Sequence, residues 1–441
     1  MIYLLLVLLV ALILIEYILS RRDLLYISLM STLSFTFALV IVIVNFNWEY
    51  EMSIEAFFIF LGAFIIIFIG EHLTRSFFKT PKKRYGVKSY NQVNINKIVY
   101  IGTVIFMAIS AFVYVYGIIR IGIMTLSSGV VGDDRSILGA YRYAAIREGN
   151  SGTKIAEFLC VISECLAYSY MLLFISNRKR KKYLIPIGLY LISIVFSTGR
   201  SSIIKFAIVT LVLYYLLETR PKGQTIKFEK TMFKIVLIGS VVFISLGTLT
   251  GKSNLYANFF ENISMYTGSA IPAFDDYLSE YKIVTNSFGS ETLWGINNFF
   301  LKFGINLFGT TNNYLPYIYL PYMNHSTNIY TFLRRPYNDF GLIGLFIVLL
   351  VISIVYTKIY LKIINNSYKN YTFSILMFAT LYYPIFLSFT DFRFFDVISI
   401  TGGIQIILYY YVGKYIDNQI KKVEYIQSIK TKNRRDYEIF I

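Results

Sequence analysis

The chain is dominated by uninterrupted apolar runs, and this feature limits its fold more than any other. A helix needs about 20 apolar residues to cross a hydrocarbon core of ~30 Å. The chain is 56% hydrophobic and 15% charged, with a mean hydropathy of +0.58 over 441 residues. We therefore predict an all-α polytopic membrane protein with about 11 transmembrane helices and one long external loop. The predicted helices are residues 2–19, 24–46, 54–71, 98–119, 155–176, 183–198, 202–217, 235–250, 341–360, 371–389 and 394–413.

Basic clusters between these runs give the orientation, because lysine and arginine are enriched in cytoplasmic loops. All the large clusters lie on one side if the N-terminus is outside and the C-terminus is cytoplasmic. The first run lacks a basic start and a small-residue cleavage site, so we interpret it as a retained helix. The predicted organisation is a bundle of helices 1–8 over residues 1–250 with an external loop at 120–154, a large external loop at 251–340, helices 9–11 over 341–413, and a basic cytoplasmic tail at 414–441.

Composition and motifs argue against several functions. The net charge of +17 is explained by the inner basic loops, so a nucleic-acid partner is not needed to account for it. The stretch from Gly247 to Ser253 has three residues between its glycines, whereas a phosphate-binding loop has four. Two cysteines cannot form a cysteine-rich metal site. We expect no cofactor and no metal.

Arginine is more abundant on the predicted outer side than topology requires. A guanidinium binds phosphate through two parallel hydrogen bonds and keeps its charge when it is partly desolvated. One interpretation is a pocket for an anionic lipid head group, such as a polyprenyl diphosphate. The alternative is a set of interfacial arginines whose side chains reach back to water. The candidate substrate-binding arginines are Arg135, Arg142, Arg200, Arg334 and Arg335.

Two carboxylates lie in the predicted helix 155–176. Glu157 and Glu164 are seven residues apart, so both are expected to face the bundle interior. Carboxylates inside a membrane often mark function. These two are expected to pair with Lys205 or with an arginine, and a purely structural pair is an equally good explanation.

The large external loop holds 21 aromatic residues in 90, together with several asparagines. Aromatic faces and amide groups suit sugar rings, although an interfacial aromatic belt explains the same composition. His325 is the only histidine on the predicted outer side, and Asp339 follows it in sequence. A neutral imidazole can take a proton from a hydroxyl group at neutral pH. His325 and Asp339 are therefore the candidate catalytic residues, with a structural histidine as the alternative.

The stretch from His325 to Gly344 resembles the end of the large periplasmic loop and the following helix of the oligosaccharide repeat unit polymerases, the Wzy-type O-antigen and capsule polymerases. The turn from Ser197 to Ser202 is similar to their short arginine-bearing turn, and the O-antigen ligases are related. This resemblance implies a metal-independent glycosyl transfer on the outer face of the bacterial cytoplasmic membrane. It implies undecaprenyl-diphosphate-linked oligosaccharides as substrates, and a flippase and a chain-length regulator as protein partners. Asn328 and Tyr330 lie in the matching stretch and are expected to contact the glycan.

Two other functions stay open at this point. A ligase of the O-antigen type would move finished polymer to a lipid acceptor. A flippase for lipid-linked oligosaccharides would carry the substrate across the membrane, and such transporters usually contain paired structural repeats.

Overall fold

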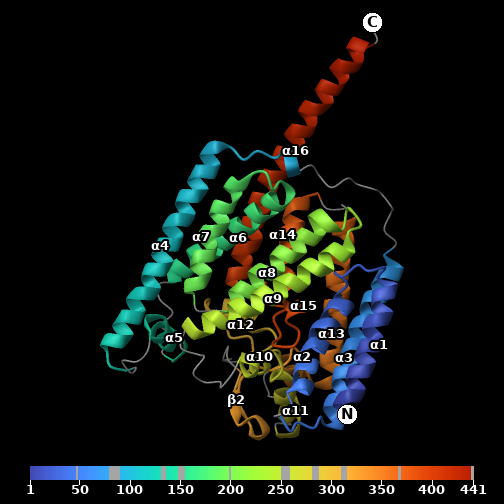
Figure 1. The fold of residues 1–441 in the computed structure, drawn as a ribbon, viewed down its shortest axis with the longest axis vertical. Coiled ribbons are helices and arrows are strands. Elements are labelled where there is room, and N and C mark those ends of the chain that lie inside the picture. Colours follow the sequence, from blue (N-terminus) through green and yellow to red (C-terminus); the bar gives the residue numbers. More distant parts are fainter. Residues whose placement is uncertain are drawn as a thin grey trace. The chain divides into compact units, whose positions relative to one another are not determined.

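A computed structural model of the protein describes residues 1–45, 48–78, 90–130, 136–147, 154–197, 200–249, 259–280, 288–308, 315–365 and 369–438. The chain divides into two compact units, each assembled from separate segments (Figure 1). The first unit contains Met1–Thr80, Lys252–Leu361 and Leu381–Gly403, and the second contains Pro81–Gly251, Lys362–Thr380 and Ile404–Ile441.

The first unit is built on three mutually contacting helices, α1 (Ile2–Leu19), α2 (Ile27–Val44) and α3 (Ile54–Phe77). Phe35 of α2 packs against α3, and its ring centroid lies 4.9 Å from those of Phe60 and Phe64. The outward-facing side chains of α1 are exposed and apolar, as expected for a helix that contacts lipid.

The same unit also contains short elements, most of them in the range 251–340. They are α10 (Phe259–Thr267), α11 (Ala270–Glu280), α12 (Trp294–Leu301), the antiparallel strands β1 (Ile318–Leu320) and β2 (His325–Thr327) joined by η5 (Pro321–Met323), and α15 (Tyr383–Phe386). Asp275 of α11 accepts hydrogen bonds from the Tyr50 hydroxyl at 2.6 Å and from the Ser53 backbone N–H at 2.9 Å. Ser53 also caps α3 by accepting from the Ala56 N–H at 3.1 Å. These bonds fix α11 against the start of α3.

The long helix α13 (Arg334–Ile364) is broken at Gly341. Gly341 has φ 66° and ψ −171°, a conformation that is almost restricted to glycine. The break separates a short polar helix at 334–340 from the apolar helix that follows. The predicted helix 341–360 therefore begins at this break and continues beyond its expected end, to Ile364.

Replacing Gly341 with alanine is expected to cost about 1–3 kcal/mol, because a Cβ atom strains this backbone conformation. The matched control is Gly102→Ala in α4 (Lys97–Ser127), where an added Cβ meets no atom within 4 Å and the backbone is helical. That change should leave the stability unchanged or raise it by up to about 1 kcal/mol. Thermal unfolding of the purified protein in detergent measures both. Equal midpoints for the two variants would contradict the assigned strain.

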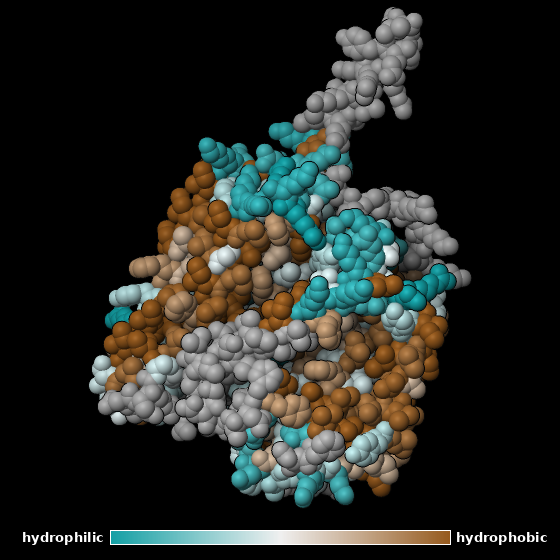
Figure 2. Space-filling view, in the orientation of Figure 1, coloured by the Kyte–Doolittle hydropathy of each residue, from teal (hydrophilic) through white to brown (hydrophobic). Residues whose placement is uncertain are grey.

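The second unit consists of helices and connecting turns in its described residues, with no strand among them. Its elements are α4, η1 (Tyr90–Gln92), α5 (Ile137–Arg147), α6 (Lys154–Ser176), η2 (Lys181–Tyr183), α7 (Leu184–Phe196), α8 (Arg200–Tyr214), the π-helical turn η3 (Tyr215–Thr219), α9 (Thr225–Leu249), α14 (Tyr371–Leu381) and most of α16 (Ile400–Glu438). Contacts join α4, α6 and α7 to one another, and α6 to α8. Apolar side chains cover the exposed face of α4 (Figure 2), among them Ile98, Ile105, Ile109 and Phe112.

Seven helices of the described residues are long and apolar enough to cross a membrane. They are α1, α2, α3, α4, α6, α8 with its extension η3, and α13. The protein is therefore an all-α, multi-pass membrane protein. These helices correspond to seven of the eleven predicted crossings, and the number eleven stays a prediction.

Two predicted ranges differ from the helices that form. The run 371–389 contains two helices, α14 and α15, because Pro384 lies in the first turn of α15 and cannot continue a preceding helix. The run 394–413 was expected to be one helix, but residues before Ile400 form turns and α16 continues to Glu438. The helix thus extends through much of the predicted tail.

Candidate functional site

The candidate site lies at the N-terminus of α13, where two adjacent arginines begin the helix. Arg334 and Arg335 are each only 4% exposed, and Asn338 and Asp339 on the next turn are 2% exposed. A helix N-terminus carries a partial positive charge, so it repels cations. Two buried guanidinium groups at this position therefore require anions close by.

Arg334 has a carboxylate partner and two aromatic partners. Its Nη1 atom pairs with Oε2 of Glu291. The guanidinium carbon lies 4.6 Å from the ring centroid of Tyr277 on α11 and 5.3 Å from that of Tyr330. Such cation–π contacts stabilise an arginine that has lost water. Its buried Nε atom has no hydrogen-bond partner among the described residues.

Arg335 is held by Asp391 from the segment that precedes α16. Nε of Arg335 donates to Oδ1 at 2.8 Å, and Nη2 donates to Oδ2 at 3.3 Å. This two-point geometry is the form in which arginine binds carboxylates and phosphates most strongly. The side chain of Arg393 lies 3.8 Å from the same carboxylate.

Asp339 anchors the turn that carries Glu291. One of its carboxylate oxygens, Oδ2, accepts the backbone N–H of Glu291 at 3.1 Å and that of Thr292 at 2.6 Å. The Tyr277 hydroxyl donates to Oδ1 of Asn338 at 2.6 Å. Helix α13 therefore positions both the turn at 288–293 and the ring that covers Arg334.

Burial changes the proton affinity of this cluster. It raises the pKa of the Glu291 carboxyl group, although the positive charge of Arg334 acts in the opposite direction. Burial also raises the pKa of Tyr277 to about 12. Glu291 therefore takes up a proton more readily than an exposed glutamate, most of all if Arg334 is engaged elsewhere.

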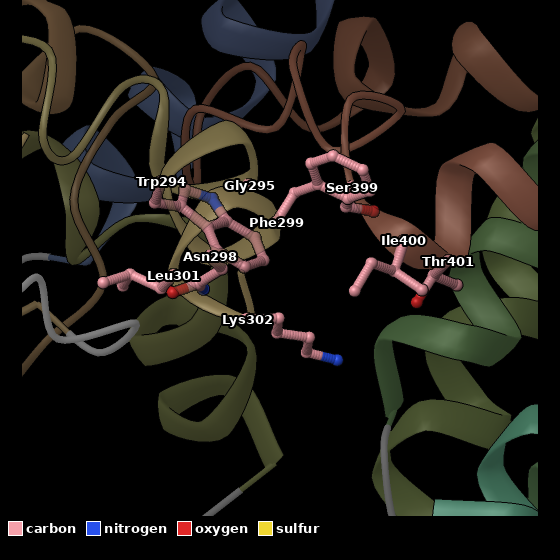
Figure 3. A pocket seen from close by; sticks show the side chains of 9 residues that line it. All are labelled: Trp294, Gly295, Asn298, Phe299, Leu301, Lys302, Ser399, Ile400 and Thr401. Atoms are coloured by element: carbon pink, nitrogen blue, oxygen red, sulfur yellow. The ribbon is translucent and has the colours of Figure 1, made fainter. Parts of the chain in front are cut away.

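An open pocket of about 480 Å³ lies beside α12, the helix that follows the turn at 288–293 (Figure 3). Its lining comes from α12 and the residues after it, and from the start of α16. The lining residues are Trp294, Gly295, Asn298, Phe299, Leu301, Lys302, Ser399, Ile400 and Thr401. Trp294 follows Glu291 by three residues, and Ser399 follows Asp391 by eight. Each wall of the pocket is thus connected by a short segment to one of the two carboxylates that hold the arginines.

The structure brings four of the predicted residues together, namely Arg334, Arg335, Asp339 and Tyr330. Tyr330 is 2% exposed, and its hydroxyl donates to the carbonyl of Pro316 at 3.0 Å. Asn328 is half-buried just after β2. Whether these residues bind a substrate stays a prediction.

His325 lies on β2, paired in register with Leu320 of β1. The side chain is partly exposed, and burial lowers its pKa while the nearby charge of Glu261 acts in the opposite direction. At neutral pH the imidazole is therefore mostly neutral, the state that a general base requires.

The other predicted arginines belong to the second unit. Arg142 lies in α5 and Arg200 is the first residue of α8; the side-chain placement of Arg200 and the whole of Arg135 lie outside the described residues. In the same unit, Nζ of Lys205 lies 2.6 Å from Oε1 of Glu164, so the predicted ion pair forms. The expectation that Glu157 also faces the interior is wrong, because its side chain is exposed.

Sequence reasoning missed Glu291, Asp391 and Tyr277. The available signal was the arginine pair itself, because two adjacent buried arginines at a helix start require two acidic partners. The partners lie 43 and 56 residues from the arginines along the chain. Among the described residues, no group of three or more histidine, cysteine or acidic side chains could hold a metal ion.

The fold and this site define a multi-pass membrane protein with a buried arginine–carboxylate cluster beside an open aromatic pocket. Comparisons with family models, with curated proteins and with solved structures find no match.

Proposed function

We propose that the protein is a polymerase of undecaprenyl-diphosphate-linked oligosaccharide repeat units, acting on the outer face of the bacterial cytoplasmic membrane. The proposal includes eleven crossings, an external N-terminus, a cytoplasmic C-terminus, and cooperation with a flippase and a chain-length regulator. The observation that carries it is the pair of buried guanidinium groups of Arg334 and Arg335, each matched to one carboxylate.

The arginines suit a diphosphate leaving group. In the proposed reaction, the bond between the anomeric carbon of the growing chain and its lipid diphosphate breaks, and the electron pair stays on the diphosphate oxygen. The hydroxyl oxygen of the incoming repeat unit forms the new bond to that carbon. Arg334 and Arg335 neutralise the charge that develops on the leaving group, and such electrostatic stabilisation is usually the largest catalytic contribution.

The proton of the acceptor hydroxyl needs a base. When Arg334 turns from Glu291 to the diphosphate, Glu291 loses the charge that keeps it ionised, and burial then favours its protonation. Glu291 can therefore accept the proton of the acceptor hydroxyl group while Arg334 binds the diphosphate leaving group. His325, which is mostly neutral at pH 7, is the second candidate for this role. Asp339 acts as a positioning residue in this scheme, because it holds the backbone of Glu291.

The test is deletion of the gene in its host, followed by sizing of the surface glycan and of the lipid-linked pool. We expect single repeat units in place of a ladder, with the ladder restored by the wild-type gene. A normal ladder that is not attached to its final acceptor would instead establish a ligase. Repeat units confined to the inner leaflet would establish a flippase, and either result would overturn the proposal.

A further inference from the structure

We infer that the pocket formed by α12 and the start of α16 binds an anionic sugar ring, a pyranose that carries a carboxylate or a phosphate group. The inference rests on the proposed function and names the class of sugar that the site recognises. The lining has three kinds of group, and each corresponds to one part of such a ligand.

The aromatic part consists of Trp294 and Phe299, which are partly exposed in the pocket lining (Figure 3). A pyranose presents an apolar face of C–H groups that stacks on an aromatic ring. Tryptophan suits this contact because it combines a large apolar face with a polar edge. The position of Trp294 is fixed, since a Cβ atom on the adjacent Gly295 would lie 2.7 Å from the carbonyl oxygen of Ile398. The two walls therefore touch at Gly295.

The neutral polar part is the amide group of Asn298. This side chain is half-buried in the pocket and has no hydrogen-bond partner within the described part of the chain. An amide offers both a donor and an acceptor, which is the combination that two neighbouring sugar hydroxyl groups require.

The charged part is Lys302, the only ionisable side chain among the nine lining residues. It is exposed and makes no ion pair with any described carboxylate. Its ammonium group extends toward Ile400 and Thr401 on the opposite wall (Figure 3). An uncompensated cation beside a stacking surface favours a sugar with a negative substituent over a neutral one.

The position of the pocket connects this ligand to the proposed reaction. Both walls continue directly into the segments that hold Arg334 and Arg335. A sugar ring in the pocket would therefore contact residues that follow Glu291 by three positions and Asp391 by eight positions along the chain.

Intrinsic fluorescence tests the inference, because the chain has only two tryptophans, Trp48 and Trp294. The full-length Trp48→Phe variant in detergent leaves Trp294 as the sole indole. Glucuronate, glucose 6-phosphate and glucose are then titrated separately. We expect a saturable change in emission with one or both anionic sugars, and at least tenfold weaker binding of glucose. A response to glucuronate alone assigns a sugar acid, and a response to the phosphate alone assigns a phosphorylated sugar.

Matched variants identify the groups responsible. Lys302→Met should weaken binding of the anionic sugar by about tenfold or more, whereas Lys302→Arg should retain it. Tyr317→Ala removes an aromatic side chain that is 69% exposed and outside the pocket, and it should have no effect. If Trp48→Phe does not fold, the wild type is compared with Trp294→Phe, which should lose the response.

Equal affinities for glucose and glucuronate, or an unchanged affinity in Lys302→Met, would overturn the inference. These titrations measure binding without polymerisation. A failed titration together with single repeat units in the deletion strain would reject the pocket and keep the polymerase. A successful titration with an intact ladder in that strain would reject the polymerase alone.

Discussion

Replacing Arg334 and Glu291 together with glutamine is expected to reduce polymer formation by at least about 10²–10³-fold, because loss of one charge-stabilising group usually has that effect and the proposed base is removed as well. Removing both charges avoids leaving one of them buried and unpaired, so the protein should still fold and insert. Gel analysis of the glycan ladder measures polymer formation, and immunoblotting of membranes measures insertion.

The matched control is the same double change at another ion pair of the first unit. Arg75→Gln with Glu71→Gln neutralises a buried pair on α3 that is not part of the arginine cluster at α13. We expect this variant to keep its ladder. A full-length ladder from the Arg334 and Glu291 variant would reject the assigned role of the cluster.

Arg75→Ala alone should lower the free energy of unfolding by about 3–5 kcal/mol, because it leaves the Glu71 carboxylate buried without its cation. Glu71 is fully buried, and its Oε1 atom accepts from Nε and Nη2 of Arg75 at 3.0 and 2.7 Å. The guanidinium carbon also lies 3.3 Å from the ring centroid of Tyr26. The thermal midpoint of the purified protein in detergent measures the loss.

Two further variants distinguish the effect of an unpaired buried charge on stability from the effect of removing an arginine side chain. Arg75→Ala combined with Glu71→Ala should recover much of the stability, because neither charge then remains unpaired. Arg21→Ala removes an exposed arginine and should change stability by less than about 0.5 kcal/mol. The assignment fails if Arg75→Ala unfolds at the same temperature as Arg21→Ala.

The helical fold was predictable because apolar runs of membrane length leave few alternatives to a helix. The ends of the helices were less predictable where a helix continues through polar residues beyond its apolar run. The run 54–71 ends at Glu71, the first charged residue after Glu55, whereas α3 continues to Phe77 because Glu71 and Arg75 neutralise each other. Helix α16 likewise continues beyond its apolar part, where hydropathy gives no signal.

The site was predictable only in part. Arginine adjacent to arginine near a helix start could be recognised in one sequence, and so could Asp339 on the same helix. Glu291 and Asp391 could not be assigned, because a single sequence does not tell which distant carboxylate meets which cation. The pocket was also out of reach, since it depends on the close approach of Gly295 to Ile398.

The attachment of Glu291 and Thr292 to Asp339 uses backbone N–H groups, so it does not depend on which side chains follow in α12. Substitutions at Trp294, Asn298 or Phe299 can therefore alter what enters the pocket without displacing the arginine cluster. We expect natural variation among close homologues to concentrate on that face of α12, while the anchoring aspartate and both arginines stay invariant. A site divided in this way can acquire a new glycan specificity in single steps, with its chemistry intact at every stage.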